Sequence, residues 1–205
     1  MPRTTNSAGG RFVLVDQRDK PQTADEMCRL CADIESLPSA AALREAAHAA
    51  WPAGAPVVVV ANHLCGSALD HSIELFRDEA VVAGFCAATC CHDRCAWTSY
   101  CNRRYFASLR FGEAEFTQLC AWSVLAPRRN KPPGERSRVR AAASELGLGL
   151  SQCETLGAAS RLLIDTGRRL RLEALGLHSQ LRYHVPFELT ADNVLIVAHR
   201  PPPRL

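Results

Sequence analysis

The feature that most constrains the fold is a run of β-branched residues, Pro56-Val-Val-Val-Val-Ala61. Consecutive valines predict a strand, and the lack of polar alternation predicts burial on both of its faces. Strands of this kind lie in the middle of parallel sheets that helices cover on both sides. We therefore expect a central parallel strand at 56–61 within an α/β chain.

The rest of the chain alternates between strand and helix patterns. Apolar runs predict strands at 11–16 and 84–91, with a short strand and turn at 31–37. Helix-forming composition and periodicity predict helices at 39–50 (capped by Ser39), 66–80, 97–110 and 154–176. Two more strand candidates, 180–186 and 193–199, have a short connection and can pair antiparallel. This alternation favours a mainly parallel sheet with sites at the carboxyl ends of its strands.

Length and composition bound the remaining possibilities. The 205 residues suit a single domain, with a mobile basic linker at about 127–150 where Pro, Gly, Arg and Lys collect. The net charge of +3, from 22 Arg and two Lys against 21 acids, permits an RNA partner without requiring one. The longest apolar run is too short to span a bilayer, so we expect no membrane contact. With no signal-like N-terminus, the ten cysteines are expected to be reduced thiols of an intracellular protein.

Five residues of metal-binding types lie within a short segment and raise the question of a metal. They are Cys90, Cys91, His92, Cys95 and Cys101, a composition that could hold zinc. Adjacent cysteines in a strand point to opposite faces, however, so Cys90 and Cys91 cannot easily share one tetrahedral ion. Cysteine is also a common small core residue. We therefore expect no metal here, with zinc as the alternative.

Two polar segments directly follow the two central strands. Residues 62–70 read Asn-His-Leu-Cys-Gly-Ser-Ala-Leu-Asp, and residues 90–95 read Cys-Cys-His-Asp-Arg-Cys, with Trp97 and Tyr100 behind them. They resemble the His-Leu-Cys-Gly-x-Ala-x-Asp and Cys-Cys-His-x-Arg-Cys-x-Trp-x-x-Tyr signatures of eukaryotic tRNA 2′-O-methyltransferases that modify nucleotide four of the acceptor stem. Further matches follow in the same order at Trp122, 162–168, Tyr183 and 192–195. The resemblance runs from about Phe12 to the end of the chain.

This resemblance implies a particular fold. It is a class I methyltransferase (Rossmann-like) α/β sheet lacking its first strand and Gly-rich loop, with an antiparallel C-terminal strand pair. The chain is expected to correspond to the catalytic domain, truncated at its N-terminus. The Gly-rich turn and the small Cys/His zinc finger common in the family both find no match in it.

The resemblance also implies a cofactor, S-adenosylmethionine, with contacts assigned by position in the fold. Asp16 would bind the cofactor's ribose hydroxyls, and Asp33 would bind its adenine amino group. A strand-end turn residue and a simple helix cap are the structural alternatives for these two acids. Cys65 and Gly66 would line the site. Cys65 needs no nucleophilic role, because methylating a ribose oxygen requires no covalent enzyme intermediate.

The implied substrate is tRNA, and DNA is not expected. The resemblance makes His63 the candidate that accepts the proton of the 2′-hydroxyl or positions it. Asn62, Asp70 and His92 are supporting candidates. Phosphate contacts are assigned to arginines near the site, namely Arg94, Arg103 and Arg104, whereas the basic residues of 127–150 read by default as a solvated surface.

Two departures from the family pattern support a second hypothesis. The family usually carries lysine before His-Leu-Cys-Gly, where this chain has Asn62, and asparagine cannot bind a phosphate or lower a pKa by its charge. The Gly-rich cofactor turn is the other difference. A catalytically inactive RNA-binding or scaffold protein on the same fold is therefore the alternative to a methyltransferase.

Overall fold

The computed structural model describes residues 12–16, 27–47, 54–77, 82–126, 133–186, 189–190 and 192–201. The chain divides into two compact units, Met1–Pro56 and Val57–Leu205, and each is described by itself. None of the helices in the described ranges combines the length and the hydropathy that crossing a lipid bilayer requires.

The first unit is built on a parallel strand pair. Strand β1 (Phe12–Asp16) lies beside β2 (Met27–Cys31), in a register that sets Asp16 opposite Cys31. The strand predicted at 11–16 is confirmed. Of the strand and turn predicted at 31–37, the turn is confirmed and the strand lies earlier in the chain. Strand β2 ends where that strand was expected to begin, and a 3-10 turn, η1 (Ile34–Ser36), follows it. Helix α1 (Ala40–Ala47) begins after Ser39, whose Oγ accepts a hydrogen bond from Ala42 N at 3.2 Å, as predicted for its cap.

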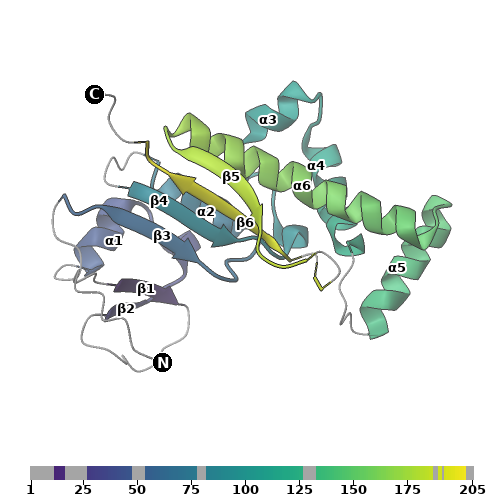
Figure 1. The fold of residues 1–205 in the computed structure, drawn as a ribbon, viewed down its shortest axis with the longest axis horizontal. Helices are drawn as coiled ribbons and strands as arrows, with labels where there is room; N and C mark the ends of the chain where they lie inside the picture. The colour runs from purple at the N-terminus through teal and green to yellow at the C-terminus, as the bar shows by residue number, and fades with distance from the viewer. Residues whose placement is uncertain are drawn as a thin grey trace. The chain divides into compact units, whose positions relative to one another are not determined.

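The second unit contains a four-stranded mixed sheet in the order β3-β4-β6-β5 (Figure 1). Strands β3 (Val57–Ala61) and β4 (Val82–Ala88) are parallel. Strand β6 (Val194–His199) is antiparallel to both β4 and β5 (His178–Tyr183). The predicted antiparallel C-terminal pair is confirmed, and the protein is a mixed α/β structure.

The valine-rich strand has one buried face rather than the two we expected. In this sheet β3 is the end strand, and Val58 and Val60 are 62% and 74% exposed, while Val59 and Ala61 pack on the core. The expectation of a central strand with both faces buried is therefore wrong for these side chains. Valine favours extended backbone on exposed and buried faces alike, so the run alone does not distinguish them.

Two helices cover the buried face of this sheet. Helix α2 (Ser67–Leu75) contributes Leu69 and Ile73, and the long helix α6 (Leu150–Ala174) contributes Leu172. These side chains pack on Phe85 of β4 and Ile196 of β6. The helices predicted at 66–80 and 154–176 are both present. Helix α2 ends at Leu75, with residues 78–80 outside the described ranges, and α6 begins a turn earlier.

An aromatic cluster fixes the segment between β4 and α6. It joins α3 (Arg103–Ser108) and α4 (Glu113–Trp122) to α6 through Tyr100, Phe106, Phe116 and Ile164. Only the second half of the helix predicted at 97–110 is helical. Asn102 caps α3 there, because its side chain accepts a hydrogen bond from Tyr105 N at 3.2 Å.

The segment predicted as a basic linker contains a helix. Helix α5 (Pro133–Leu146) buries Val139 and Ala143 against Leu125 of the turn η4 (Ser123–Leu125) and Cys153 of α6. The expectation of a linker is wrong for these residues, because apolar side chains spaced four apart give α5 a packing face. Residues 127–132 lie outside the described ranges.

Candidate functional site

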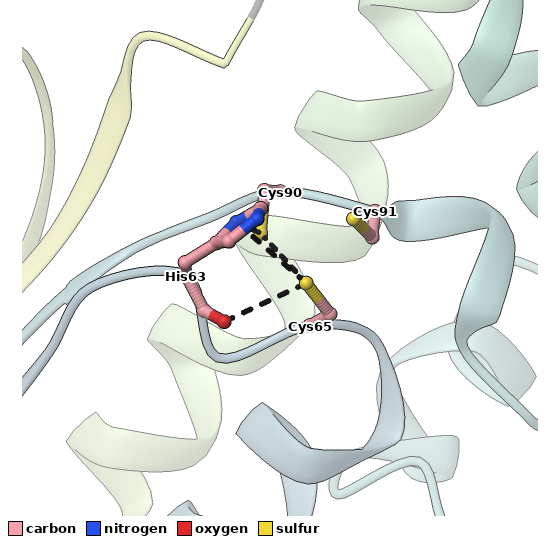
Figure 2. A group of neighbouring side chains, drawn as sticks. All are labelled: His63, Cys65, Cys90 and Cys91. Atoms are coloured by element: carbon pink, nitrogen blue, oxygen red, sulfur yellow. Dashed lines mark hydrogen bonds between the residues drawn. The ribbon is translucent and has the colours of Figure 1, made fainter. Parts of the chain in front are cut away.

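The loops that follow β3 and β4 lie next to each other. The two strands are parallel neighbours, with Ala61 paired to Ala87. The loops that follow them therefore begin at the same end of the sheet. The first loop carries His63 and Cys65, and the second carries Cys90 and Cys91. We call these four residues the His/Cys cluster, and Figure 2 shows their side chains converging from the two loops.

Three side chains of the His/Cys cluster, those of His63, Cys65 and Cys90, are within contact distance. His63 Nδ1 lies 3.2 Å from Cys90 Sγ and 3.7 Å from Cys65 Sγ, and the two sulfur atoms lie 3.3 Å apart. The Cys65 thiol also points to the carbonyl oxygen of His63, at 3.6 Å. His63 is exposed and Cys90 is buried, so the cluster extends from the surface into the protein.

The backbone conformation at Cys91 explains how the side chains of two consecutive cysteines can both join the cluster. Strand β4 ends at Ala88, earlier than the predicted strand at 84–91, and Cys91 has left-handed dihedrals of φ 42° and ψ 47°. The alternation of side chains that we used to separate Cys90 from Cys91 therefore does not apply, and that step of the sequence argument is wrong. Burial raises the pKa of both thiols, and the neighbouring Cys65 raises each of them further.

A close backbone approach fastens the two loops together. Gly66 has φ 57°, and a Cβ atom there would lie 2.5 Å from the carbonyl oxygen of Arg94, in the turn η3 (His92–Arg94). Ser67 Oγ donates a hydrogen bond to the same oxygen at 3.3 Å and accepts one from Ala96 N at 3.2 Å. Gly66 is thus required for contact between the loops. A cofactor contact at this glycine stays a prediction.

Behind the loops lies a buried charge network centred on Arg168. Its guanidinium donates to both oxygens of Asp70, at 2.6 and 3.1 Å, and to Asp165 Oδ1 at 3.1 Å. It also donates to the carbonyl oxygen of Gly66 at 3.0 Å. Burial lowers the pKa of Arg168, but Asp70, Cys95 and Asp165 outweigh that effect and raise its pKa well above the ordinary value. Arg168 is therefore a permanent cation linking α6 to the loop after β3.

His92 extends this network. Its Nε2 donates to Asp165 Oδ2 at 2.9 Å, which leaves its buried Nδ1 without a partner among the described residues. Burial lowers the pKa of His92 more than Asp165 raises it, so the imidazole is neutral near pH 7. Burial raises the pKa of Asp165, but His92 and Arg168 outweigh it and the net pKa is lowered. The pair is a hydrogen bond between a neutral imidazole and a carboxylate.

The predicted catalytic residues divide into two groups. Asn62 and His63 are exposed at the end of β3. Asp70 and His92 are each 1% exposed and bonded within the network. A catalytic contribution from Asp70 or His92 stays a prediction, and their burial favours positioning the loops over touching a substrate.

The remaining predicted contacts lie at several places. Arg94, Arg103 and Arg104 are exposed, in η3 and at the start of α3. In the first unit, Asp16 ends β1, and Asp33 follows β2. Asp33 Oδ1 accepts a hydrogen bond from Glu35 N at 3.0 Å, so this acid is the cap of η1.

Sequence reasoning did not anticipate the roles of Cys91, Asp165 and Arg168. A usable signal was present for Cys91, because His-x-Cys and Cys-Cys follow consecutive strands that pair in parallel. Asp165 and Arg168 lie one turn apart on an amphipathic helix, and charges on its buried face need partners.

The family described as Methyltransferase TRM13 matches residues 11–199. The chain therefore belongs to the TRM13 methyltransferase family. No solved structure matches the chain.

Several curated relatives carry tRNA modification names. The tRNA:m(4)X modification enzyme TRM13 of Schizosaccharomyces pombe is 28% identical over 162 residues, which cover 72% of this chain and 40% of the relative. The corresponding enzyme of Yarrowia lipolytica is 26% identical over 164 residues, 70% of this chain and 35% of the relative. The Homo sapiens homolog is 25% identical over 143 residues, which cover 57% of this chain and 30% of the homolog. The matched part thus spans less than half the length of these relatives.

Proposed function

We propose that this chain is the methyl-transfer domain of an S-adenosylmethionine-dependent tRNA 2′-O-methyltransferase acting on nucleotide four of the acceptor stem. The observation that carries the proposal is the position of the two family motifs. Their loops lie side by side at the carboxyl ends of the parallel strands β3 and β4, where open α/β sheets bind ligands. The relatives named tRNA:m(4)X modification enzymes support a tRNA substrate.

The proposed fold is the class I methyltransferase, Rossmann-like fold. Two features support it. The second unit places a parallel pair, β3 and β4, beside an antiparallel pair, β6 and β5, at the C-terminal end of the chain. The first unit adds a second parallel pair, β1 and β2.

The chemistry requires little from the protein beyond alignment. S-adenosylmethionine supplies a methyl group that its sulfonium already activates. The chain must hold the ribose 2′-hydroxyl in line with that methyl group and help to remove the proton. His63 is exposed at the end of β3, where it can accept a hydrogen bond or donate one, and Asn62 beside it can donate through its amide.

The acids of the first unit are the proposed cofactor contacts. Asp16 is the last residue of β1, and Asp33 follows β2, the strand that pairs with β1 in parallel. Asp16 would accept hydrogen bonds from the ribose hydroxyls, and Asp33 from the adenine amino group. In the second unit Cys65 would line the methyl-transfer site.

The direct test is methyl transfer to defined tRNA transcripts. With S-adenosylmethionine labelled in its methyl group, we expect label in tRNA, recovered after digestion as a 2′-O-methylated nucleoside from position four. The matched control is the same transcript with 2′-deoxyribose at that nucleotide, which lacks the attacking oxygen and should take up no label. Label on a base, or equal labelling of the control, would contradict 2′-O transfer.

The same experiment separates the enzyme from the non-catalytic alternative. A protein that binds the transcript tightly but transfers no methyl group, and does not bind the cofactor in calorimetry, would be an RNA-binding or scaffold protein. The alternative is favoured by Asn62, at the position where the resemblance implies a lysine. If the lysine contributes charge to the reaction, Asn62→Lys should increase turnover without tightening cofactor binding.

Exposed arginines beside the loops are the proposed phosphate contacts. Replacing Arg103 and Arg104 together with alanine should weaken tRNA binding for all tRNA sequences. The slope of log affinity against log salt should fall by about one for each phosphate that the variant no longer neutralises. Filter binding at several salt concentrations measures both quantities. Arg182→Ala, an exposed arginine on β5, is the matched control, and an equal effect there would reject a specific role for α3.

A further inference from the structure

The His/Cys cluster combines donor atoms that suit a soft divalent metal. One imidazole nitrogen and three thiol sulfurs, from His63, Cys65, Cys90 and Cys91, all lie within 4.8 Å of one another. Three cysteines and one histidine form one of the ligand sets that structural zinc sites use. The four residues arrive from only two loops, each contributing a pair close in sequence.

Three of the four donor atoms have spacings close to those around a single tetrahedral ion. Bond lengths of about 2.3 Å to sulfur and 2.0–2.1 Å to nitrogen place the corners of such a site about 3.5–3.8 Å apart. The measured separations are 3.2 Å from His63 Nδ1 to Cys90 Sγ, 3.3 Å between the Cys65 and Cys90 sulfurs, and 3.7 Å from His63 Nδ1 to Cys65 Sγ. Movements of a few tenths of an ångström would fit these three atoms around one ion, and Cys91 Sγ lies within 4.8 Å of each of them.

Unusual backbone conformations lie at two of the four residues. Among the described residues, positive φ occurs at three non-glycine positions, His63 (65°), Cys91 (42°) and Arg110 (62°). Such conformations are unfavourable for residues with a Cβ and persist where they serve a site. The conformation of Cys91 is what turns its sulfur to the same side as that of Cys90.

We propose that His63, Cys65, Cys90 and Cys91 bind one Zn²⁺ ion in a closed tetrahedral site. Four protein ligands leave no open position, so the ion is structural and takes no part in bond making. It ties the loop after β3 to the loop after β4, and the contact of Gly66 with Arg94 fastens the same two loops beside it.

The zinc site narrows the role of His63 if the proposed methyl-transfer function holds. Coordination through Nδ1 uses the lone pair that a general base needs and places the proton on Nε2. His63 then acts as a positioning residue whose Nε2–H donates to the ribose oxygen. The general-base role requires a histidine free of metal.

The metal content of the purified chain tests the site without any activity measurement. Expressed with zinc and purified under reducing conditions, the chain should carry about one zinc ion, measured by plasma mass spectrometry. Exchange with Co²⁺ should produce the intense visible bands of tetrahedral cobalt and a thiolate charge-transfer band. A wild-type chain with neither zinc nor these bands would overturn the proposal, as would bound iron or a Cys65–Cys90 disulfide in intact-mass measurement.

Variants separate ligation from folding. Removing a residue that only supports a metal ligand already costs about 10–100-fold in metal affinity, so Cys65→Ser and Cys90→Ser should each lower zinc affinity by at least about 100-fold. Cys31→Ser, in the first unit, is the matched control and should keep its zinc. His63→Cys should also keep zinc, because four cysteines form a known ligand set, whereas His63→Ala should lose affinity. Unchanged affinity in Cys65→Ser and Cys90→Ser would overturn the site.

Zinc binding and methyl transfer can fail separately. A chain that binds zinc through these residues yet transfers no methyl group would reject the proposed function and keep the metal site. A metal-free chain that methylates tRNA would reject the metal site and keep the proposed function. His63→Cys distinguishes the roles of His63 within an active enzyme, since it preserves the metal and removes the Nε2–H. With positioning by Nε2–H, its kcat should fall while its zinc content stays unchanged.

Discussion

Replacing Arg168 with leucine should lower the free energy of unfolding by about 3–5 kcal/mol, because two buried carboxylates then lose their cation. Arg168 is 0% exposed, and Asp70 and Asp165 are each 1% exposed. Its guanidinium donates to both acids and to the carbonyl oxygen of Gly66. Leucine fills much of the volume but satisfies none of these acceptors. Urea unfolding at neutral pH, followed by circular dichroism, measures the loss.

The neighbouring arginine is the control for this prediction. Arg169 pairs with Glu173 one turn further along α6, and both side chains are partly exposed. Arg169→Ala should therefore cost at most about 1 kcal/mol. The stability loss from Arg168→Lys should lie between those of Arg168→Leu and Arg169→Ala. An ammonium keeps the charge but cannot reproduce the forked contacts to Asp70. An Arg168→Leu variant as stable as Arg169→Ala would show that the network contributes little to stability.

Gly66→Ala should lower the free energy of unfolding by about 2–4 kcal/mol, through backbone strain and steric overlap together. The dihedrals of Gly66, φ 57° and ψ −127°, are accessible essentially to glycine alone. A Cβ there would also lie 2.5 Å from Arg94 O and 2.6 Å from Arg94 Cβ, which forces the two loops apart. Because these loops carry the His/Cys cluster, the variant should bind zinc more weakly as well.

Gly147→Ala is the matched control for the close approach. Gly147 has a similar φ of 64°, but a Cβ there would meet nothing within 4 Å. Its cost should be that of the left-handed backbone alone, about 1–2 kcal/mol. Chemical unfolding of both variants measures the difference. Equal losses of stability in the two proteins would mean that contact with Arg94 does not explain the requirement for glycine at position 66.

Local patterns predicted most of the elements but not where β4 ends. Strands with apolar runs and helices with apolar faces, such as β3 and α6, were predictable because their periodicities are local properties. The predicted strand at 84–91 continued past Ala88, the last residue of β4, because Thr89, Cys90 and Cys91 suit a buried strand as well as a loop. That small error was one reason for expecting no metal at these cysteines.

The candidate site was predictable in its location but not in its contacts. The two motifs predicted that the polar loops follow neighbouring parallel strands, and the sheet confirms this. Which loop residues face each other depended on the left-handed backbone at His63 and Cys91. The burial of Asp70 depended on Arg168, which lies 98 residues away in the chain.

The sequence by itself determined the family, most of the strands and helices, and the placement of two motif loops after two valine- and alanine-rich strands. These properties follow from residue order and short-range periodicity. Only the tertiary structure decided that Cys90 and Cys91 converge with His63 and Cys65, that Asp70 and His92 are buried, and that Val58 and Val60 are exposed. Each of these depends on backbone dihedrals in loops or on packing between distant segments, which no local pattern encodes.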